Sequence, residues 1–159
     1  PWRSCKSQWR GCKAYWAEMA FQLPIRIYWE DTDAGGIVFY ANYLKFFERA
    51  RTEWLRSLDL GQQRLRELTG GMFVVTDARL RYLRPARLDD ELIVTARLQE
   101  CGRASLTIEQ QALLKPEQMN PEFPPALLCE GSIRIGWVEA ATLRPARIPG
   151  PLLERLSSS

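Results

Sequence analysis

Residues 41–58 read ANYLKFFERARTEWLRSL, and this stretch decides the fold. Its apolar side chains recur at helical spacing, with charged residues between them. They are Tyr43, Leu44, Phe47, Trp54, Leu55 and Leu58. The spacing predicts a helix of about five turns with one broad apolar face. We expect Asn42 or a neighbour to cap its start and Gly61 to end it.

The segments on either side of this helix alternate between apolar and polar residues, the period of a half-buried strand. Before the helix, LPIRIYWE (23–30) places Leu23, Ile25, Ile27 and Trp29 on one face. After it, we expect a less regular connection over 62–71 and then a series of strands. These strands are VVTDARLRYLR (74–84), with Val74, Ala78, Leu80 and Tyr82 on one face, ELIVTARLQE (91–100), with Leu92, Val94, Ala96 and Leu98 on one face, ASLTIEQQALL (104–114) and LLCEGSIRIGWVE (127–139).

The order strand, long helix and several further strands predicts an α+β domain. One apolar helix is available to cover one face of the sheet. An antiparallel sheet of about five strands wrapped around one long central helix satisfies both patterns. An ordinary open α+β sandwich is the alternative. Four prolines make residues 115–125 a loop, and 143–156 reads as an extended segment followed by a short helix.

Charge and length bound the domain organisation and the partners. The 159 residues include 22 basic and 19 acidic side chains, a formal net charge of +3. Residues 1–18 contain four of the basic side chains and one acidic side chain, so the remaining chain is neutral and nucleic-acid binding is disfavoured. We expect a disordered or non-native leader over 1–18, with a basic arm for RNA or an anionic membrane as the alternative. We expect a single domain over 19–159.

Cysteine usage and hydropathy indicate the compartment. The four cysteines form no CxxC pair and the chain contains no histidine, so no metal site is expected. Cys101 and Cys129 are interpreted as free thiols without catalytic work. No apolar run approaches the ~18 residues of a membrane span. We expect a reduced, cytoplasmic setting.

Directly before the helix, residues 30–43 read EDTDAGGIVFYANY. Acids that precede a Gly-Gly pair usually form a turn, in which their carboxylates accept hydrogen bonds from local N–H groups. A catalytic carboxylate is the second interpretation. We interpret Asp31 as a structural residue of the loop and Glu30 as a strand-end residue.

The stretch YWEDTDAGGIVFYANYLKFFERARTEWLR (28–56) closely resembles the signature of YbgC-like hotdog-fold acyl-CoA thioesterases, which are related to the 4-hydroxybenzoyl-CoA thioesterases. Residues 73–92 and 131–149 resemble later segments of that family, so the similarity extends over 22–155. It implies a subunit that dimerises by joining two sheets, commonly paired into a homotetramer, with active sites at the dimer interface. It also implies an acyl- or aroyl-CoA substrate and no metal or organic cofactor.

In this family pattern the second acid of the D-x-D motif is the catalytic carboxylate, which is Asp33 here. It would act as general base or as nucleophile, and the sequence leaves both routes open. We expect the backbone N–H of Tyr40, near the helix N-terminus, to bind the oxyanion. Gly35 and Gly36 would let the thioester approach the backbone, and Val38 and Phe39 are assigned to substrate binding.

Tyr40 departs from the YbgC-like pattern, because many members carry histidine at this position. The 4-hydroxybenzoyl-CoA thioesterase branch commonly has tyrosine there. A phenol with a pKa near ~10 is a poor general base, so we expect hydrogen bonding, pocket shaping or aromatic packing instead.

Other charged residues are weaker candidates. Arg81 and Arg84, together with Arg87, are predicted to meet CoA phosphates. Glu48 is a candidate second acid, although we favour an ion pair with Arg49, Arg51 or Arg56.

Two other classes of function are open. A hotdog dehydratase would need a histidine, which the chain lacks. A non-catalytic interaction module is suggested by the association of YbgC-like proteins with the Tol-Pal envelope system and with phospholipid-synthesis or acyl carrier proteins. An intact Asp33 favours the enzyme.

Overall fold

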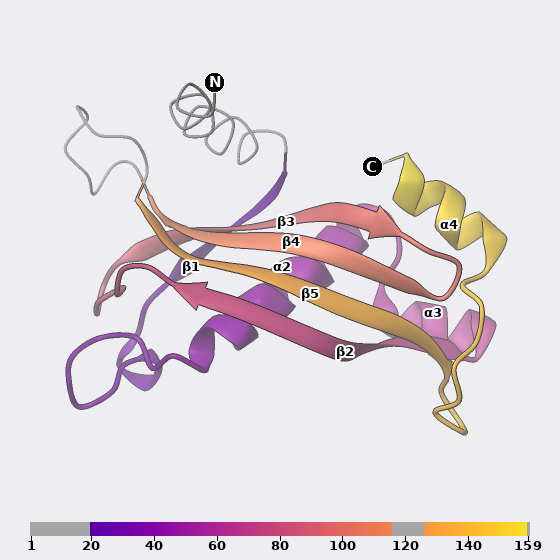
Figure 1. Cartoon of the computed structure of the whole chain (residues 1–159), viewed down its shortest axis with the longest axis horizontal. Helices are drawn as coiled ribbons and strands as arrows, with labels where there is room; N and C mark the ends of the chain where they lie inside the picture. Colours follow the sequence, from indigo (N-terminus) through magenta and orange to yellow (C-terminus); the bar gives the residue numbers. More distant parts are fainter. Residues whose placement is uncertain (1–19, 116–125, 159) are drawn as a thin grey trace, which may run out of the picture.

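The computed structural model describes residues 20–115 and 126–158, so the predicted leader and most of the proline-rich loop lie outside the described residues. The described part contains one five-stranded antiparallel sheet with the strand order β1-β3-β4-β5-β2. Figure 1 shows helix α2 lying along one face of this sheet.

The strands are β1 (Phe21–Arg26), β2 (Gly71–Tyr82), β3 (Glu91–Cys101), β4 (Ser105–Leu114) and β5 (Leu127–Glu139). The helices are α2 (Asn42–Ser57), α3 (Gln62–Thr69), α4 (Gly150–Ser157) and the short 3-10 helix η1 (Trp29–Asp31). The predicted α+β fold, five strands around one long helix, is confirmed.

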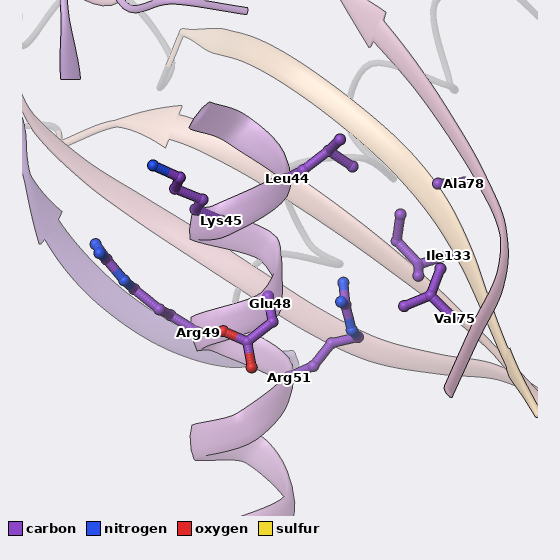
Figure 2. Close-up of a pocket in the computed structure, with 8 residues that line it drawn as sticks. All are labelled: Leu44, Lys45, Glu48, Arg49, Arg51, Val75, Ala78 and Ile133. Atoms are coloured by element: carbon purple, nitrogen blue, oxygen red, sulfur yellow. The ribbon is translucent and has the colours of Figure 1, made fainter. Parts of the chain in front are cut away.

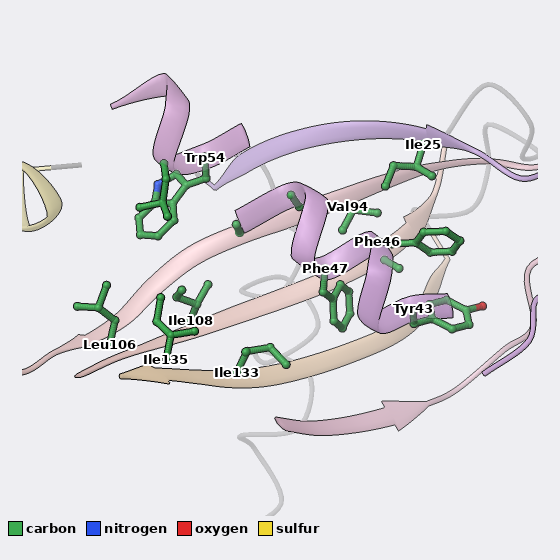
Figure 3. Close-up of a cluster of buried hydrophobic side chains, with 14 of the residues drawn as sticks. Ile25, Tyr43, Phe46, Phe47, Trp54, Val94, Leu106, Ile108, Ile133 and Ile135 are labelled. Carbon is green, nitrogen blue, oxygen red and sulfur yellow. The ribbon is translucent and has the colours of Figure 1, made fainter. Parts of the chain in front are cut away.

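The hydrophobic core lies between α2 and the sheet (Figure 3). The predicted face of β3 is confirmed, because Leu92, Val94 and Ala96 are all buried. On α2 the predicted face is partly wrong, since Leu44 is 41% exposed whereas Phe46 is fully buried. The buried stripe of the helix consists of Tyr43, Phe46, Phe47, Ala50, Trp54 and Leu55. These positions repeat at three and four residues, and Leu44 lies to one side of them.

A glycine on β5 lets the helix approach the sheet closely. A Cβ atom on Gly131 would lie 2.8 Å from Cε2 of Phe47 and 3.1 Å from the backbone oxygen of Arg79. The ring of Phe47 therefore packs directly over the strand backbone. A side chain at position 131 would push the helix away from β5.

A buried polar link joins α2 to the middle of the sheet. Nη1 of Arg51 donates a hydrogen bond to Oε1 of Gln110 on β4, at 2.7 Å. Nε2 of Gln110 in turn donates to the backbone oxygen of Phe47 at 2.9 Å and to that of Thr95 at 3.2 Å. Both side chains are buried, so these bonds replace those that water would make.

One predicted feature at the chain segments flanking α2 is wrong and another is partly wrong. Trp29 does not continue the first strand, because β1 ends at Arg26 and Trp29 begins η1 with its side chain 80% exposed. The chain turns there because the carboxylate of Asp31 accepts the N–H of Tyr28 at 2.9 Å. The N-cap position of α2 is Ala41, the neighbour of Asn42 that the prediction allowed, but no side chain makes the expected capping hydrogen bond, and the Asn42 side chain binds the preceding loop instead.

The segment after α2 is also more regular than expected. The helix ends at Ser57, and Asp59, with a positive φ of 59°, turns the chain. Gly61 instead stands at the N-terminal cap position of α3, and the predicted irregular connection contains this helix. Local turn chemistry at a non-glycine residue therefore replaces the glycine stop that the sequence suggested.

Strand β2 contains a bulge that the alternation pattern misses. The register shifts between Val75 and Asp77, so Val75 pairs with Ile135 and Ala78 pairs with Ile133. Because one extra residue reverses the facing of the strand, Val75, rather than the predicted Val74, shares a face with Ala78. The five residues from Val75 to Arg79 are exposed on this free edge of the sheet.

Candidate active site

The loop between η1 and α2 is held in place by Asp31. Its backbone oxygen accepts the N–H of Phe39 at 2.9 Å and the side-chain Nδ2 of Asn42 at 2.9 Å. Its carboxylate binds Tyr28, and the residue is buried. The structural role predicted for Asp31 is therefore confirmed.

Asp33 lies at the exposed end of this loop. Its Oδ1 accepts the N–H of Gly35 at 2.8 Å, and its backbone oxygen accepts the N–H of Gly36 at 3.0 Å. The other carboxylate oxygen has no hydrogen-bond partner among the described residues. Both interpretations of the motif are thus compatible with the geometry, because one oxygen holds the turn and the other faces solvent.

The two glycines serve this turn for different reasons. A Cβ atom on Gly35 would lie 3.0 Å from Oδ1 of Asp33, which is tighter than an ordinary contact. Gly36 has a positive φ of 75°, which side chains other than glycine rarely adopt. The carboxylate position therefore depends on both glycines.

The rest of the motif divides into buried and exposed residues. Val38 is buried and its N–H donates to the backbone oxygen of Ala86 at 2.9 Å, so it fixes the loop to the neighbouring segment. Phe39 and Tyr40 are exposed. Their ring centroids lie 4.8 Å apart, and the ring of Tyr82 approaches that of Tyr40 edge-on at 6.2 Å.

The first turn of α2 leaves N–H groups unused. The N–H of Asn42 donates to the oxygen of Phe39 at 2.9 Å, and that of Leu44 donates to the oxygen of Ala41 at 3.1 Å. The N–H groups of Tyr40 and Ala41 have no partner in the part of the chain that the structure describes. Free N–H groups at a helix start, together with the helix dipole, favour negative charge.

Tyr82 is a site residue that the sequence reasoning placed on the sheet and did not connect with the chemistry. Its hydroxyl donates to the backbone oxygen of Tyr40 at 3.0 Å. Burial raises the pKa of Tyr82, and burial also raises the pKa of Tyr43, so both phenols stay protonated at neutral pH. The alternation of β2 puts Tyr82 at the end of the strand, on the face that covers the helix. That position is the sequence feature from which its approach to the start of α2 could have been predicted.

Of the predicted phosphate-binding arginines, Arg87 lies beside the loop motif, because its backbone forms an antiparallel bridge with Ile37. Arg81 pairs with Glu130 at 2.5 Å. It points to the sheet face opposite that of its neighbour Tyr82, as successive strand residues do. Arg84 is exposed. Their role in binding CoA stays a prediction.

Glu48 does not make the ion pair expected of it. Its Oε1 accepts the hydroxyl of Thr52 at 2.7 Å, whereas Arg56 pairs with Glu53 and Arg51 is buried against Gln110. Over 20–115 and 126–158, no ion pair joins Glu48 to an arginine. The i,i+3 pairing of Arg56 with Glu53 on the same helix face takes its place.

A groove of about 510 Å³ lies between α2 and the edge strand β2 (Figure 2). Its walls combine apolar side chains with charged residues from α2. They are Leu44, Lys45, Glu48, Arg49, Arg51, Val75, Ala78 and Ile133. The groove begins one helical turn after Tyr40, since Leu44 follows it by four residues.

The structure describes two of the cysteines, and burial supports the inert role predicted for Cys129, whereas that of Cys101 stays a prediction. Cys101 is an exposed free cysteine and Cys129 a buried one. Burial raises the pKa of the Cys129 thiol to about 12, so it stays protonated and is a poor nucleophile at neutral pH.

Comparison with known proteins decides the family. The family model described as "Thioesterase superfamily" matches residues 35–118, which include Gly35, Gly36, Tyr40 and the whole of α2. The chain belongs to this superfamily. The predicted hotdog-fold thioester hydrolase, of the YbgC-like type, is therefore confirmed.

Individual relatives agree with this placement. The chain is 37% identical over 129 residues to "Acyl-CoA thioesterase YbgC" of Haemophilus influenzae, covering 81% of this chain and 88% of the relative. A protein of the same name in Helicobacter pylori is 31% identical over 84% of this chain and 97% of its own length. The crystal structure of a hypothetical protein from Aquifex aeolicus has a TM-score of 0.71 and 28% identity, covering 86% of this chain and 98% of that one. These comparisons give no support to the Tol-Pal alternative.

Within the described residues, no helix is long and apolar enough to span a bilayer.

Proposed function

We propose that this thioesterase hydrolyses an acyl- or aroyl-CoA thioester to the free acid and CoA, with Asp33 as the essential carboxylate. Water adds its oxygen to the carbonyl carbon, the C–S bond breaks, and the departing thiolate takes up a proton. As general base, Asp33 accepts a proton from this water as its oxygen adds to the carbonyl carbon. As nucleophile, Asp33 attacks the carbonyl carbon first, the thiolate leaves from the resulting mixed anhydride, and water then hydrolyses that anhydride to the free acid and the Asp33 carboxylate. The backbone N–H of Tyr40 stabilises the oxyanion that forms in between.

One observation carries this assignment. One short loop contains both groups that the reaction needs: among the described residues, one carboxylate oxygen of Asp33 and the backbone N–H of Tyr40 have no hydrogen-bond partner. The curated relatives are named acyl-CoA thioesterases, which supports the substrate class. The groove beside α2 supplies apolar walls for the acyl group.

We also propose that two copies join through their β2 edges. This edge has no strand neighbour other than β5 among the described strands, and Val75 on it is 55% exposed. Pairing two such edges satisfies their free N–H and C=O groups and covers the groove. A homotetramer built from two dimers is the fuller form of the same proposal.

A cytoplasmic location is part of the proposal, because free thiols suit a reducing compartment. Acyl carrier or phospholipid-synthesis proteins are part of the proposal as protein partners.

The test of the catalytic assignment is a panel of short-chain, long-chain and aromatic acyl-CoAs, with release of free thiol followed colorimetrically. The wild type is compared with Asp33→Asn and with the control Asp59→Asn, which changes another exposed aspartate. We expect Asp33→Asn to lose at least about a hundredfold in kcat, the lower range for general-base catalysis, and the control to keep its rate. Full activity in Asp33→Asn, or no turnover of any substrate by the wild type, contradicts the assignment.

Light scattering during size-exclusion chromatography tests the dimer. Val75→Arg places a charge on the proposed interface and should shift the mass toward the monomer. Leu68→Arg, at a more exposed apolar residue of α3, is the control. An unchanged mass for Val75→Arg would rule out pairing through β2.

A further inference from the structure

The backbone oxygen of Tyr40 lies outside the hydrogen-bond ladder of α2. In a regular helix this oxygen would accept the N–H of Leu44, four residues later. Here Leu44 instead donates to Ala41 at 3.1 Å, and the oxygen of Tyr40 accepts the hydroxyl of Tyr82 at 3.0 Å. Because the N–H of Ala41 has no partner in the described part of the chain, Tyr82 makes the one hydrogen bond there to the Tyr40–Ala41 peptide.

Holding one oxygen holds a whole peptide group. The peptide is planar and trans, so its C=O and N–H point in opposite directions and turn together. A bond to the oxygen of Tyr40 therefore fixes the direction of the Ala41 N–H and limits rotation of the backbone next to the Tyr40 N–H. The preceding peptide is held separately, because the oxygen of Phe39 accepts the N–H of Asn42.

We propose that Tyr82 is a positioning residue for the reaction, which holds the Tyr40–Ala41 peptide directly before α2 and so limits the backbone rotation at Tyr40 that would move its N–H away from the oxyanion. This inference rests on the proposed function, in which the Tyr40 N–H meets the oxyanion. Tyr82 reaches the site from a different element, since it is the last residue of β2.

Tyr82 is itself held firmly enough for this task. Its backbone pairs with Cys129 on β5, and the N–H of the next residue, Leu83, donates to the oxygen of Leu128 at 2.8 Å. Its ring packs edge-on against those of Tyr43 and Tyr40, at 5.6 and 6.2 Å. Partial burial raises the pKa of the phenol, so the hydroxyl keeps the proton that it donates.

The expected kinetic signature follows from when the oxyanion exists. Negative charge on the carbonyl oxygen develops in the transition state and is absent from the bound substrate. A misplaced N–H therefore lowers kcat and leaves KM nearly unchanged. A side chain that only bound substrate would change KM, and one that only stabilised the fold would change the melting temperature.

The experiment replaces the hydroxyl and keeps the ring. We expect Tyr82→Phe to lower kcat about fivefold to tenfold, the rate equivalent of one hydrogen bond, with KM and melting temperature unchanged. Replacing Tyr82 by 4-aminophenylalanine restores a donor and should recover most of the rate. Replacement by 4-methoxyphenylalanine supplies no donor and should not.

Tyr43→Phe is the matched control. The hydroxyl of Tyr43 accepts the N–H of Ala86 at 3.3 Å in the interior, so its loss should lower the melting temperature and leave kcat per folded molecule unchanged. Asp33→Asn is measured in the same assay. If Asp33→Asn is inactive while Tyr82→Phe keeps the wild-type kcat, or changes only KM or stability, the positioning role is wrong and the proposed function stands. If Asp33→Asn is fully active, both fail.

Discussion

Replacing Gln110 by leucine should destabilise the protein more than the small difference between the two side-chain volumes alone would predict. Gln110 is 1% exposed and supplies the one hydrogen bond made by the Arg51 guanidinium within the described residues. A hydrogen bond to a charged group contributes roughly 1.5–3 kcal/mol, and the guanidinium left behind would be buried without an acceptor. Burial already lowers the pKa of Arg51, which shows that its charge is poorly solvated. We expect Gln110→Leu to cost about 3 kcal/mol.

For a chain of this size that loss corresponds to a fall in melting temperature of about 6–12 °C. It can be measured by urea unfolding and calorimetry at one fixed protein concentration, because the proposed dimer would make stability concentration-dependent. Gln111→Leu is the matched control. It changes the adjacent glutamine, whose side chain faces away from α2, and should cost well under 1 kcal/mol, as surface substitutions usually do.

The double variant Arg51→Met with Gln110→Leu provides the critical comparison. Removing both partners leaves no buried charge unsatisfied, so the double variant should be more stable than Gln110→Leu alone. If its loss of stability instead equals the sum of the two single losses, the two side chains are not coupled and the reasoning is refuted.

Three further changes test other parts of the structure. Gly36→Ala forces alanine into a positive φ, so it should lower the free energy of unfolding by about 1 kcal/mol, which denaturant unfolding measures. Because it also moves the Asp33 turn, it should lower kcat, which thiol release measures. Asn42→Ala removes the buried hydrogen bond to the backbone oxygen of Asp31 and should lower the free energy of unfolding by about 1 kcal/mol. Asn42→Asp keeps a polar side chain but lacks the donor, so it should lower that free energy further. Equal stabilities of the two variants in thermal melts would contradict this expectation. The folded-state pKa of Cys129, about 12, exceeds the ordinary value of 9.0, so the folded state retains a proton that the unfolded state loses, and the free energy of unfolding should fall as pH rises above about 9. Cys129→Ala should flatten that decline, and an unchanged slope of unfolding free energy against pH would argue against it.

Much of the fold could be predicted because side-chain periodicity reflects burial directly. The face of β3 that carries Leu92 and Val94 followed from alternation alone, and α2 followed from its helical spacing. The misses are local. The bulge after Val75 inserts one residue into β2, so the residues before and after it alternate out of phase. The turn at Asp59 has a positive φ at a non-glycine residue, which the sequence does not predict.

The candidate site was predictable only where it is contiguous in sequence. Asp33, the glycines and Tyr40 lie within eight residues and were found from the motif. Tyr82 lies 42 residues away from Tyr40, and tertiary contacts, among them the pairing of β2 with β5, bring its hydroxyl to the start of α2. The buried link between Arg51 and Gln110 was missed for the same reason, since neither residue type suggests a partner so far along the chain.

The strand order also has a consequence for how the molecule is assembled. β2 follows α3 in the chain, yet its described strand partner is β5, the last strand to be synthesised. Gly131, which receives the Phe47 ring, lies on that same late strand. Contacts between segments so distant in sequence form slowly, because a long loop must close before they contribute. We therefore expect a form of the chain in which β5 has not yet joined the sheet to keep the contiguous loop motif but to lack the support that β5 gives to Tyr82 at the proposed site.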